Sequence, residues 1–521
     1  MNLFSNPEIL RNARIQLRPR KLLIAAGICI VLSVAIGYAI AGSRFGFYNT
    51  EFLHSILIIQ SAVLVIGGGI ACLHAIQREK DQNTFDFQRL TRLSPLELTL
   101  GKLFGPPLMV FFVFLCFIPA AIVAAVEARA SWTILLAAYV LLILGSIVYD
   151  ALALVISLFL RRGAVTWATL FFLLFVAYTS SEPLYALYLA FGSMSPFVAV
   201  TLSQQTSWSL ASDTMMVGGH TYTLPSVFHD LFFGISVHHA LVLFIFYVTI
   251  LAWLIPAIAR NIKRDPTDYE LYTPSQALGF LCYLNFILFA FFRWTAPQVP
   301  QANRLSITTQ SLAPLDAQSA LLGINILLFF IFGFVLLRNR NQVRRYLHGA
   351  ATGSLGRLET WPAPYIFLGA LIVGAAMVLM IQWQRDPSLE WSLIVAIFRL
   401  VFFAAWLICD FLFLQWMTLR RAGHPLAMGV LYLSVYYVCA FILVESLHLE
   451  RNPFTSIFLP TPLFVLDTAS WAAHQAVWIG ALIAQIAAAV VFVSFQRRRI
   501  AELQPHSSPI PAAAHASEIS S

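Results

Sequence analysis

Residues 132–160 read WTILLAAYVLLILGSIVYDALALVISLFL, an apolar run with a single charged residue, Asp150. A helix needs about 20 apolar residues to cross the hydrocarbon core of a bilayer, and this run is longer than that. Apolar runs of about 10–14 residues are the ones that form buried helices in soluble proteins. The run therefore predicts a membrane-spanning helix.

The composition of the whole chain agrees with that prediction. Of its 521 residues, 59% are hydrophobic and 11% are charged, whereas a typical soluble domain has about 25% charged residues. This balance excludes a soluble globular protein and, outside the C-terminal tail, a disordered one. The six cysteines all lie in apolar stretches, so we expect buried thiols and neither a disulfide framework nor a metal site.

Further stretches resemble residues 132–160 in length and character. Together with that run they lie near residues 22–41, 52–76, 103–126, 132–160, 164–190, 231–258, 276–292, 320–337, 364–382, 391–416, 424–445 and 471–494. The sequence therefore predicts an all-α, polytopic integral membrane protein with about 12 transmembrane helices.

Basic residues alternate between the two sides of these spans. With the N-terminus in the cytoplasm, 25 of the 32 Lys and Arg residues lie in cytoplasmic segments, 6 lie outside, and Arg399 lies within a span. Cytoplasmic loops carry this kind of excess. We therefore expect both termini in the cytoplasm of a multi-pass protein of the cell inner (plasma) membrane. The net charge of +8 is then a sign of topology and not of nucleic-acid binding.

The polar residues after Arg260 divide the chain into two sets of six spans. The predicted parts are an N-terminal cytoplasmic interfacial helix (1–21), a six-span domain (22–259) with a cytoplasmic loop (77–102), a cytoplasmic linker (260–275), a second six-span region of unassigned role (276–496) and a disordered cytoplasmic tail (497–521).

The N-terminal segment predicts an amphipathic helix. Asn6 suits its N-cap and Pro7 its first position. Leu10, Ala13 and Leu17 share one face, and Arg11, Arg14 and Arg18 share a neighbouring face. Such a helix lies on the cytoplasmic leaflet with its arginines at the lipid phosphates. The alternative is a basic cluster that only sets topology.

The connector between the second and third spans reads QREKDQNTFDFQRLTRLSPLELTLGKL (77–103), far longer than a helical hairpin requires. Ser94, Pro95 and Glu97 have the spacing of a capping box with proline at the first helical position. The stretch therefore predicts a helix, a break and a second helix that leads into the membrane. A solvated charged connector is the alternative.

Three pieces of this connector, at 78–86, 93–98 and 101–103, resemble the cytoplasmic loop of ABC-2 type ABC transporter permeases, and the Asn6-Pro7 opening resembles the interfacial helix of that family. Asn83 stands where the family usually has Gly. The resemblance covers about the first 260 residues. The residues that match the family's ATPase-coupling interface are Glu79, Thr84, Phe85, Ser94, Pro95, Glu97 and Lys102.

The resemblance implies the transmembrane subunit of an ABC transporter, an exporter, driven by a separate ATP-binding subunit that docks on this loop. It also implies two membrane units, from a homodimer, from a second permease or from the two halves of this chain. The sequence contains no G-x-x-x-x-G-K-[ST] loop, so this chain is expected to have no catalytic residues of its own, and ATP and Mg²⁺ are expected in the partner subunit.

Charged residues inside the spans are candidate functional sites because burying them in lipid is costly. The clearest are Asp150, Arg399, Asp410 and Glu445. They support an alternative function, an ion-coupled secondary transporter of twelve spans. A membrane enzyme acting on lipid-linked substrates is a third class, but no outside loop carries clustered carboxylates or histidines.

Overall fold

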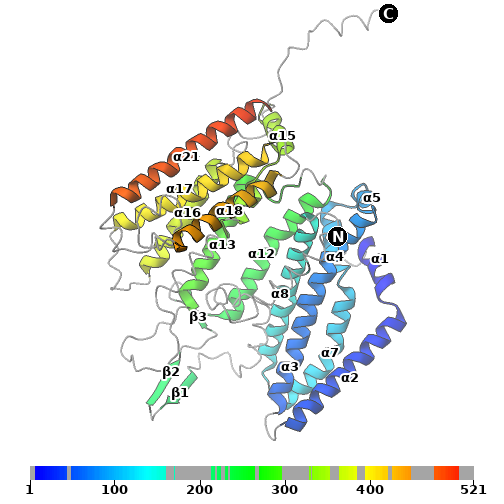
Figure 1. Cartoon of the computed structure of the whole chain (residues 1–521). Coiled ribbons are helices and arrows are strands. Elements are labelled where there is room, and N and C mark those ends of the chain that lie inside the picture. The colour runs from blue at the N-terminus through cyan, green and yellow to red at the C-terminus, as the bar shows by residue number, and fades with distance from the viewer. Residues whose placement is uncertain are drawn as a thin grey trace, which may run out of the picture. The chain divides into compact units, whose positions relative to one another are not determined.

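The computed structural model describes residues 6–43, 48–128, 130–159, 169, 213–217, 220–224, 229–232, 235–264, 269–295, 328–329, 331–351, 363–383, 393–420, 425–446 and 475–503. The chain forms two compact units (Figure 1). The first comprises Met1–Leu271 and Phe286–Ala320, and the second comprises Tyr272–Asn285 and Leu321–Ser521.

The first unit is built from helices. They are α1 (Pro7–Gln16), α2 (Pro19–Ser43), α3 (Tyr48–Ala62), the π-helical turn η2 (Val63–Gly67), α4 (Gly68–Asp81), α5 (Phe85–Arg89), α6 (Pro95–Phe104), α7 (Leu108–Glu127), α8 (Trp132–Phe159) and α12 (His239–Ile262). The segments α3, η2 and α4 follow one another without a break and together make the second predicted span.

The second unit contains longer helices and one short basic helix. They are α13 (Pro274–Thr295), whose residues up to Asn285 belong to this unit, α15 (Arg340–Ala351), α16 (Ala363–Trp383), α17 (Leu393–Thr418), α18 (Pro425–Ser446) and α21 (Gln475–Ala501). The helix α17 packs against α16, α18 and α21. The short helix α15 lies between the spans predicted at 320–337 and 364–382.

Six helices in the described residues are long and apolar enough to cross a membrane. They are Pro19–Ala39, Phe52–Asp81, Leu108–Glu127, Trp132–Phe159, Ala240–Ile262 and Ile479–Ala501. The protein is therefore helical with several candidate spans, as predicted, and the number of crossings and the side of the termini stay predictions. The predicted span at 164–190 lies outside the described residues except for Thr169, and that at 320–337 is described only from residue 328.

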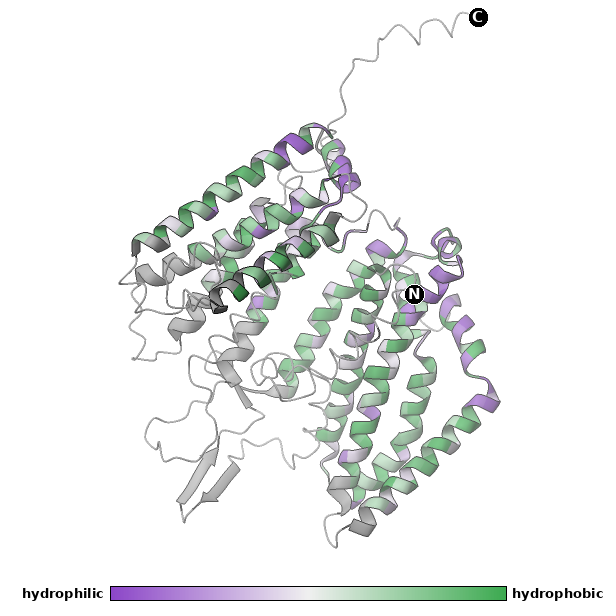
Figure 2. Cartoon of the chain, in the orientation of Figure 1, coloured by the Kyte–Doolittle hydropathy of each residue, from purple (hydrophilic) through white to green (hydrophobic). Residues whose placement is uncertain are grey.

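The apolar helices of the first unit pack in pairs. The helix α3 packs against α7, α4 packs against α8, and α12 packs against α8. In one core cluster Leu53, Ile56 and Leu57 of α3 meet Phe117 and Ala121 of α7. By contrast, Leu23 and Val31 of α2 are exposed, as expected of side chains that face lipid. Figure 2 shows hydrophobic residues along these helices and hydrophilic ones gathered at one end, on α1 and α5.

Several boundaries differ from the prediction. The third span was predicted from residue 103, but α6 ends at Phe104 and α7 begins at Leu108 because Pro106 and Pro107 interrupt the helix. The helix α2 begins within the segment predicted as interfacial, at Pro19. The helix α21 runs through Ala501, so the first residues of the predicted disordered tail are helical.

Two small β-hairpins precede α12. Strand β1 (Asp213–Val217) pairs with β2 (His220–Leu224), and β3 (His229–Phe232) pairs with β4 (Ile235–His238), both antiparallel. The span predicted from near residue 231 begins instead at His239, and the residues just before it form strands. A short apolar run cannot be assigned to strand or helix by hydropathy alone.

Candidate functional site

The N-cap of α1 joins this helix to α6. The side-chain oxygen of Asn6 accepts a hydrogen bond from the backbone N–H of Glu8 at 3.0 Å, which is the predicted cap. Its side-chain amide donates to the backbone carbonyl of Glu97 at 2.7 Å. One side chain therefore begins α1 and also fixes it on the first turn of α6.

The predicted capping box of α6 is present. The backbone N–H of Glu97 donates to Ser94 Oγ at 3.2 Å, and the backbone N–H of Ser94 donates to Glu97 Oε2 at 2.8 Å. The hydrogen bond from the Ser94 backbone holds the pKa of the Glu97 carboxyl below its usual range. The helix that follows the break therefore has a defined first turn.

The end of α4 is equally well defined. Asn83 adopts a left-handed backbone conformation with φ 55°. The backbone N–H of Thr84 donates to the carbonyl of Glu79 at 2.9 Å, and that of Asn83 donates to Lys80 at 3.2 Å. These two bonds make a Schellman motif, which usually places Gly at the left-handed position. Asn tolerates that conformation better than most residues, so Asn83 can serve where the resemblance expects Gly.

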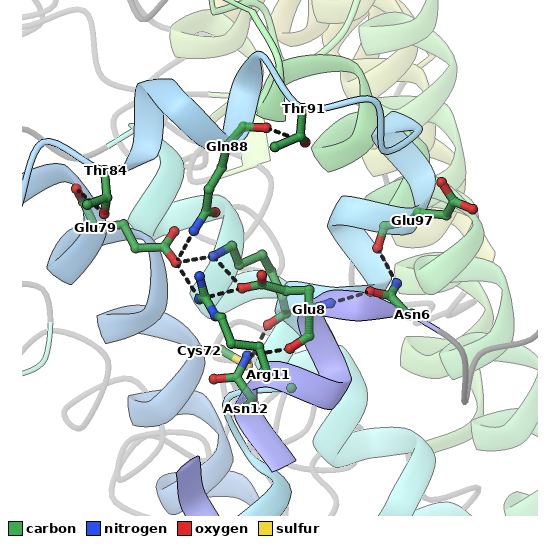
Figure 3. Close-up of polar contacts among 12 residues, drawn as sticks. Asn6, Glu8, Arg11, Asn12, Cys72, Glu79, Thr84, Gln88, Thr91 and Glu97 are labelled. Carbon is green, nitrogen blue, oxygen red and sulfur yellow. Dashed lines mark hydrogen bonds and ion pairs between the residues drawn. The ribbon is translucent and has the colours of Figure 1, made fainter. Parts of the chain in front are cut away.

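Two acidic and two basic side chains meet where α1, α4 and α6 converge (Figure 3). Lys102 of α6 pairs with Glu8 of α1 at 2.8 Å and also with Glu79 of α4. Arg11 of α1 pairs with the same two carboxylates, at 2.8 Å to Glu8 and 3.0 Å to Glu79. We call these four residues the buried charge cluster. Its positive and negative charges balance.

The cluster is out of water except on one side. The Lys102 side chain is 1% exposed and the Glu79 side chain 10%, whereas Arg11 is 48% exposed and closes the cluster toward solvent. A buried charge without a partner is costly, so each member is held by the others. The second oxygen of Glu79, Oε2, accepts no hydrogen bond from any described residue.

The short helix α5 attaches to the same carboxylate. The Gln88 side-chain amide donates to Glu79 Oε1 at 2.7 Å. Phe85 is buried, and the Arg89 guanidinium lies 5.7 Å from the centre of its ring. The turn that follows α5 is tied to the residue just after α12, because Lys263 Nζ donates to the carbonyl of Thr91 at 2.8 Å. The end of α4 and the helices α1, α5 and α6 thus meet at Glu79.

Two glycines of the α6 segment allow α1 to approach. A Cβ atom at Gly101 would lie 2.7 Å from Glu8 Cβ, and one at Gly105 would lie 2.7 Å from Asn12 Nδ2. Gln16, at the end of α1, accepts a hydrogen bond from the backbone N–H of Met109 in α7 at 3.2 Å. The whole length of α1 therefore follows α6 and the start of α7.

The seven residues that the resemblance singled out fall into two groups. Glu79, Phe85 and Lys102 are buried, whereas Thr84, Ser94 and Pro95 are exposed and Glu97 is half-buried. Glu79 pairs with Lys102 and accepts a hydrogen bond from the Thr84 backbone, and Ser94 and Glu97 bond each other in the capping box. The buried three determine the shape of the loop, and the other four lie at its surface.

Sequence reasoning missed several residues of this site. Glu8 and Arg11 complete the buried charge cluster, although the prediction placed Arg11 at lipid phosphates. An acidic residue in the first turn of an otherwise basic helix was the available signal. Phe87 and Leu90 are 75% and 84% exposed on and beside α5. Their apolar character stood out in a charged stretch, but nothing in the sequence separated them from the buried Phe85.

The charged residues predicted to lie within spans have different surroundings. Asp150 of α8 is buried against Gly68 of α4, and its Oδ1 has no hydrogen-bond partner among the described residues. Asp410 of α17 accepts a hydrogen bond from Tyr437 of α18 at 2.6 Å. Arg399 lies on α17 and Glu445 on α18, but their side chains lie outside the described part of the chain.

Comparisons with known proteins add no identity to this geometry. No family model matches the chain, and no curated protein or solved structure matches it significantly. Within the residues that the structure describes, no group of three or more His, Cys, Asp or Glu side chains could hold a metal ion.

Proposed function

We propose that this chain is the membrane-spanning permease subunit of an ABC transporter, an exporter, and that a separate ATP-binding subunit docks on residues 77–102. The observation that carries the proposal is the buried charge cluster. It joins the end of a candidate span, α4, to the loop helices and to α1. A loop braced in this way can transmit a force, whereas a solvated connector would bend.

The surface above the cluster suits a protein partner. Phe87 and Leu90 project from a segment that also exposes Asp86 and Arg92. This segment belongs to the connector between two candidate spans along the chain, so these side chains are not expected to face lipid. Exposed apolar residues surrounded by charges are typical of protein interaction sites. The exposed Thr84, Ser94 and Pro95 and the half-buried Glu97 would adjoin the same partner.

The proposed coupling uses the chain's own helices as levers. Movement of the docked subunit would push on α5 and the turn after it. Glu79 carries that displacement into α4, which continues as a spanning helix, and Lys102 carries it into α6. The helix α6 ends at Phe104 and α7 begins at Leu108, so the push reaches α7 across a proline-containing turn. No chemical step takes place in this chain under the proposal.

The proposal includes an assembly and a location. ATP and Mg²⁺ would be bound by the partner subunit, and two membrane units would be present, as a homodimer or with a second permease. The complex would reside in the cell inner (plasma) membrane, with the loop on the cytoplasmic side.

The test is co-purification from membranes of the native host. The tagged chain is purified in mild detergent, bound nucleotide-binding subunits are identified by mass spectrometry, and ATP hydrolysis is measured. The double variant Phe87→Ser, Leu90→Ser should lose the bound ATPase while eluting as a monodisperse species. Ile15→Ser is the matched control, since it removes an exposed apolar side chain from α1. An ATPase absent from wild-type preparations, or retained by the double variant, contradicts the proposal.

One observation favours the alternative, an ion-coupled secondary transporter. The Asp150 carboxyl is buried within a span beside a π-helical turn, and π turns often occur at functional sites. Transport into vesicles that lack any ATPase, driven by a proton or sodium gradient and lost in Asp150→Asn, would support this alternative. Transport that requires ATP would exclude it.

A further inference from the structure

A cavity of about 530 Å³ lies between α17, α18 and α21 of the second unit. Aromatic side chains from all three helices line it. Those that matter here are Trp406, Phe413 and Trp416 of α17, Tyr436 and Tyr437 of α18, and Phe492 of α21. Ligand sites in proteins have volumes of about 300–1,000 Å³ and mostly apolar walls. The size and lining of this cavity fit a small amphipathic molecule.

A carboxylate stands among these rings. Tyr437 donates its hydroxyl hydrogen to Asp410 Oδ2 at 2.6 Å, and Trp406 Nε1 donates to the Tyr437 oxygen at 2.6 Å. The two rings meet edge to face with centroids 6.4 Å apart. This relay holds the carboxylate as an acceptor at the cavity wall. Aromatic faces next to a carboxylate are the surroundings that attract an organic cation.

The other charged group of the described lining is at a distance. Arg420 lies two residues beyond the end of α17, and its charge is held near Trp416, which follows Asp410 by six residues, about 9 Å along the helix. Its guanidinium stacks over the Trp416 ring, 4.7 Å from the centroid. A positive ligand at Asp410 is therefore not repelled at short range.

A second observation points independently to a ligand. Gln485 of α21 lines the cavity and is only 7% exposed, yet neither its amide nitrogen nor its amide oxygen has a hydrogen-bond partner in the part of the chain that the structure describes. An unsatisfied buried amide costs about 1–3 kcal/mol. Polar groups of a bound molecule would remove that cost.

We propose that this cavity binds a lipophilic organic cation, with its positive group at Asp410, its apolar body against Phe413, Trp416 and Phe492, and a polar group at Gln485. Asp410 lies eight residues before the end of α17, about 12 Å into the apolar helix, so the ligand enters by way of the lipid phase. Binding at this cavity does not depend on the proposed ATPase partner, because all the contributing residues belong to the second unit.

The test uses purified full-length protein in lipid nanodiscs and a matched pair of probes. Tetraphenylphosphonium and tetraphenylborate have nearly the same size and shape and opposite permanent charge. We expect saturable binding of labelled tetraphenylphosphonium, weakened at least tenfold by Asp410→Asn. We expect tetraphenylborate to bind more weakly, with no loss in the variant. Glu502→Gln, which neutralises an exposed acid on the segment after α21, is the control and should bind like wild type.

A second variant keeps the proposal testable if Asp410→Asn does not fold. Tyr437→Phe retains the acid and removes the hydroxyl hydrogen bond that holds it, so its affinity should fall by a smaller factor. Saturable binding of the phosphonium in both variants with wild-type affinity would overturn the proposal. So would its absence in wild type, or equal binding of the borate.

Discussion

The two units brace the ends of their helices by different chemistry. In the first unit four charged side chains, centred on Glu79 and Lys102, hold the helices together. In the second unit the Gln415 amide exchanges hydrogen bonds with the backbone N–H and carbonyl of Arg338 at 2.9 and 3.0 Å, and Thr418 adds one at 3.1 Å. The Arg338 guanidinium lies 3.5 Å from the centre of the Tyr346 ring.

The difference between a charged and a neutral brace bears on which unit would receive the force of the proposed ATPase partner. Charged members of a buried cluster depend on one another, so displacing one helix disturbs all of them. The neutral amide of Gln415 and the Thr418 hydroxyl bond the Arg338 backbone, so displacing them leaves no buried charge without its partner. The first unit also exposes Phe87 and Leu90 above its cluster. We therefore place the proposed docking in the first unit and ligand binding in the second.

The largest effect is expected from Lys102→Met, which leaves the Glu8 and Glu79 carboxylates short of a buried cation. Breaking a buried ion pair on one side costs about 3–5 kcal/mol of unfolding free energy. Thermal unfolding in detergent measures this, and the double variant Glu79→Gln, Lys102→Met should recover most of the loss. The control Arg499→Met removes an exposed pair and should cost less than about 1 kcal/mol. Equal losses of unfolding free energy in Lys102→Met and Arg499→Met would mean that the buried charge cluster contributes no more than an exposed ion pair.

The close approach of α1 to α6 predicts the next effect. Gly101→Ala places a methyl group 2.7 Å from Glu8 Cβ, so α1 must shift. Overpacking of this kind costs about 1–3 kcal/mol. Gly480→Ala in the second unit meets nothing within 4 Å and should be neutral or slightly stabilising. Matched unfolding curves of the two variants test the contrast, and an unaffected Gly101→Ala protein would contradict the tight packing of α1.

The hydrogen bonds between the Gln415 amide and the Arg338 backbone should contribute less unfolding free energy than the buried charge cluster. Gln415→Leu removes both hydrogen bonds to the Arg338 backbone and leaves buried polar groups unpaired, at a cost of about 1–3 kcal/mol. Amide hydrogen exchange should quicken in the start of α15 and not in α6. Faster exchange in both α15 and α6 would mean that the Gln415 hydrogen bonds and the buried charge cluster are not independent.

The smallest effect concerns the α6 cap and depends on pH. Because the folded pKa of Glu97 lies below its usual value, its contribution to stability is full above that value and is lost as the pH falls through the lowered pKa. The unfolding temperatures of wild type and Glu97→Gln should therefore differ at neutral pH and converge at acid pH. A difference that persists unchanged into acid would refute the role of the ionised carboxylate.

Local chemistry explains what the sequence could predict. The Asn6 cap and the Ser94–Glu97 capping box join residues two or three apart, so their spacing is visible in the chain. The Glu8–Lys102 pair joins residues 94 apart, and a single sequence holds no record of which acid meets which base. The same holds for Asp410, which was singled out, and its partner Tyr437, which was not.

The π-helical turn at Val63–Gly67 has a consequence for the helix that contains it. One extra residue in a turn rotates everything after it by about 100° relative to an uninterrupted α-helix. This rotation lets the continuous helix formed by α3, η2 and α4 pack against α7 through α3 and, with a different face, against α8 through α4. Deleting one residue of this turn would remove the rotation, and the helix could then keep its packing against α7 or against α8 but not against both. A displacement along α4 that converted this turn to regular α-helix would therefore rotate α3 about its axis.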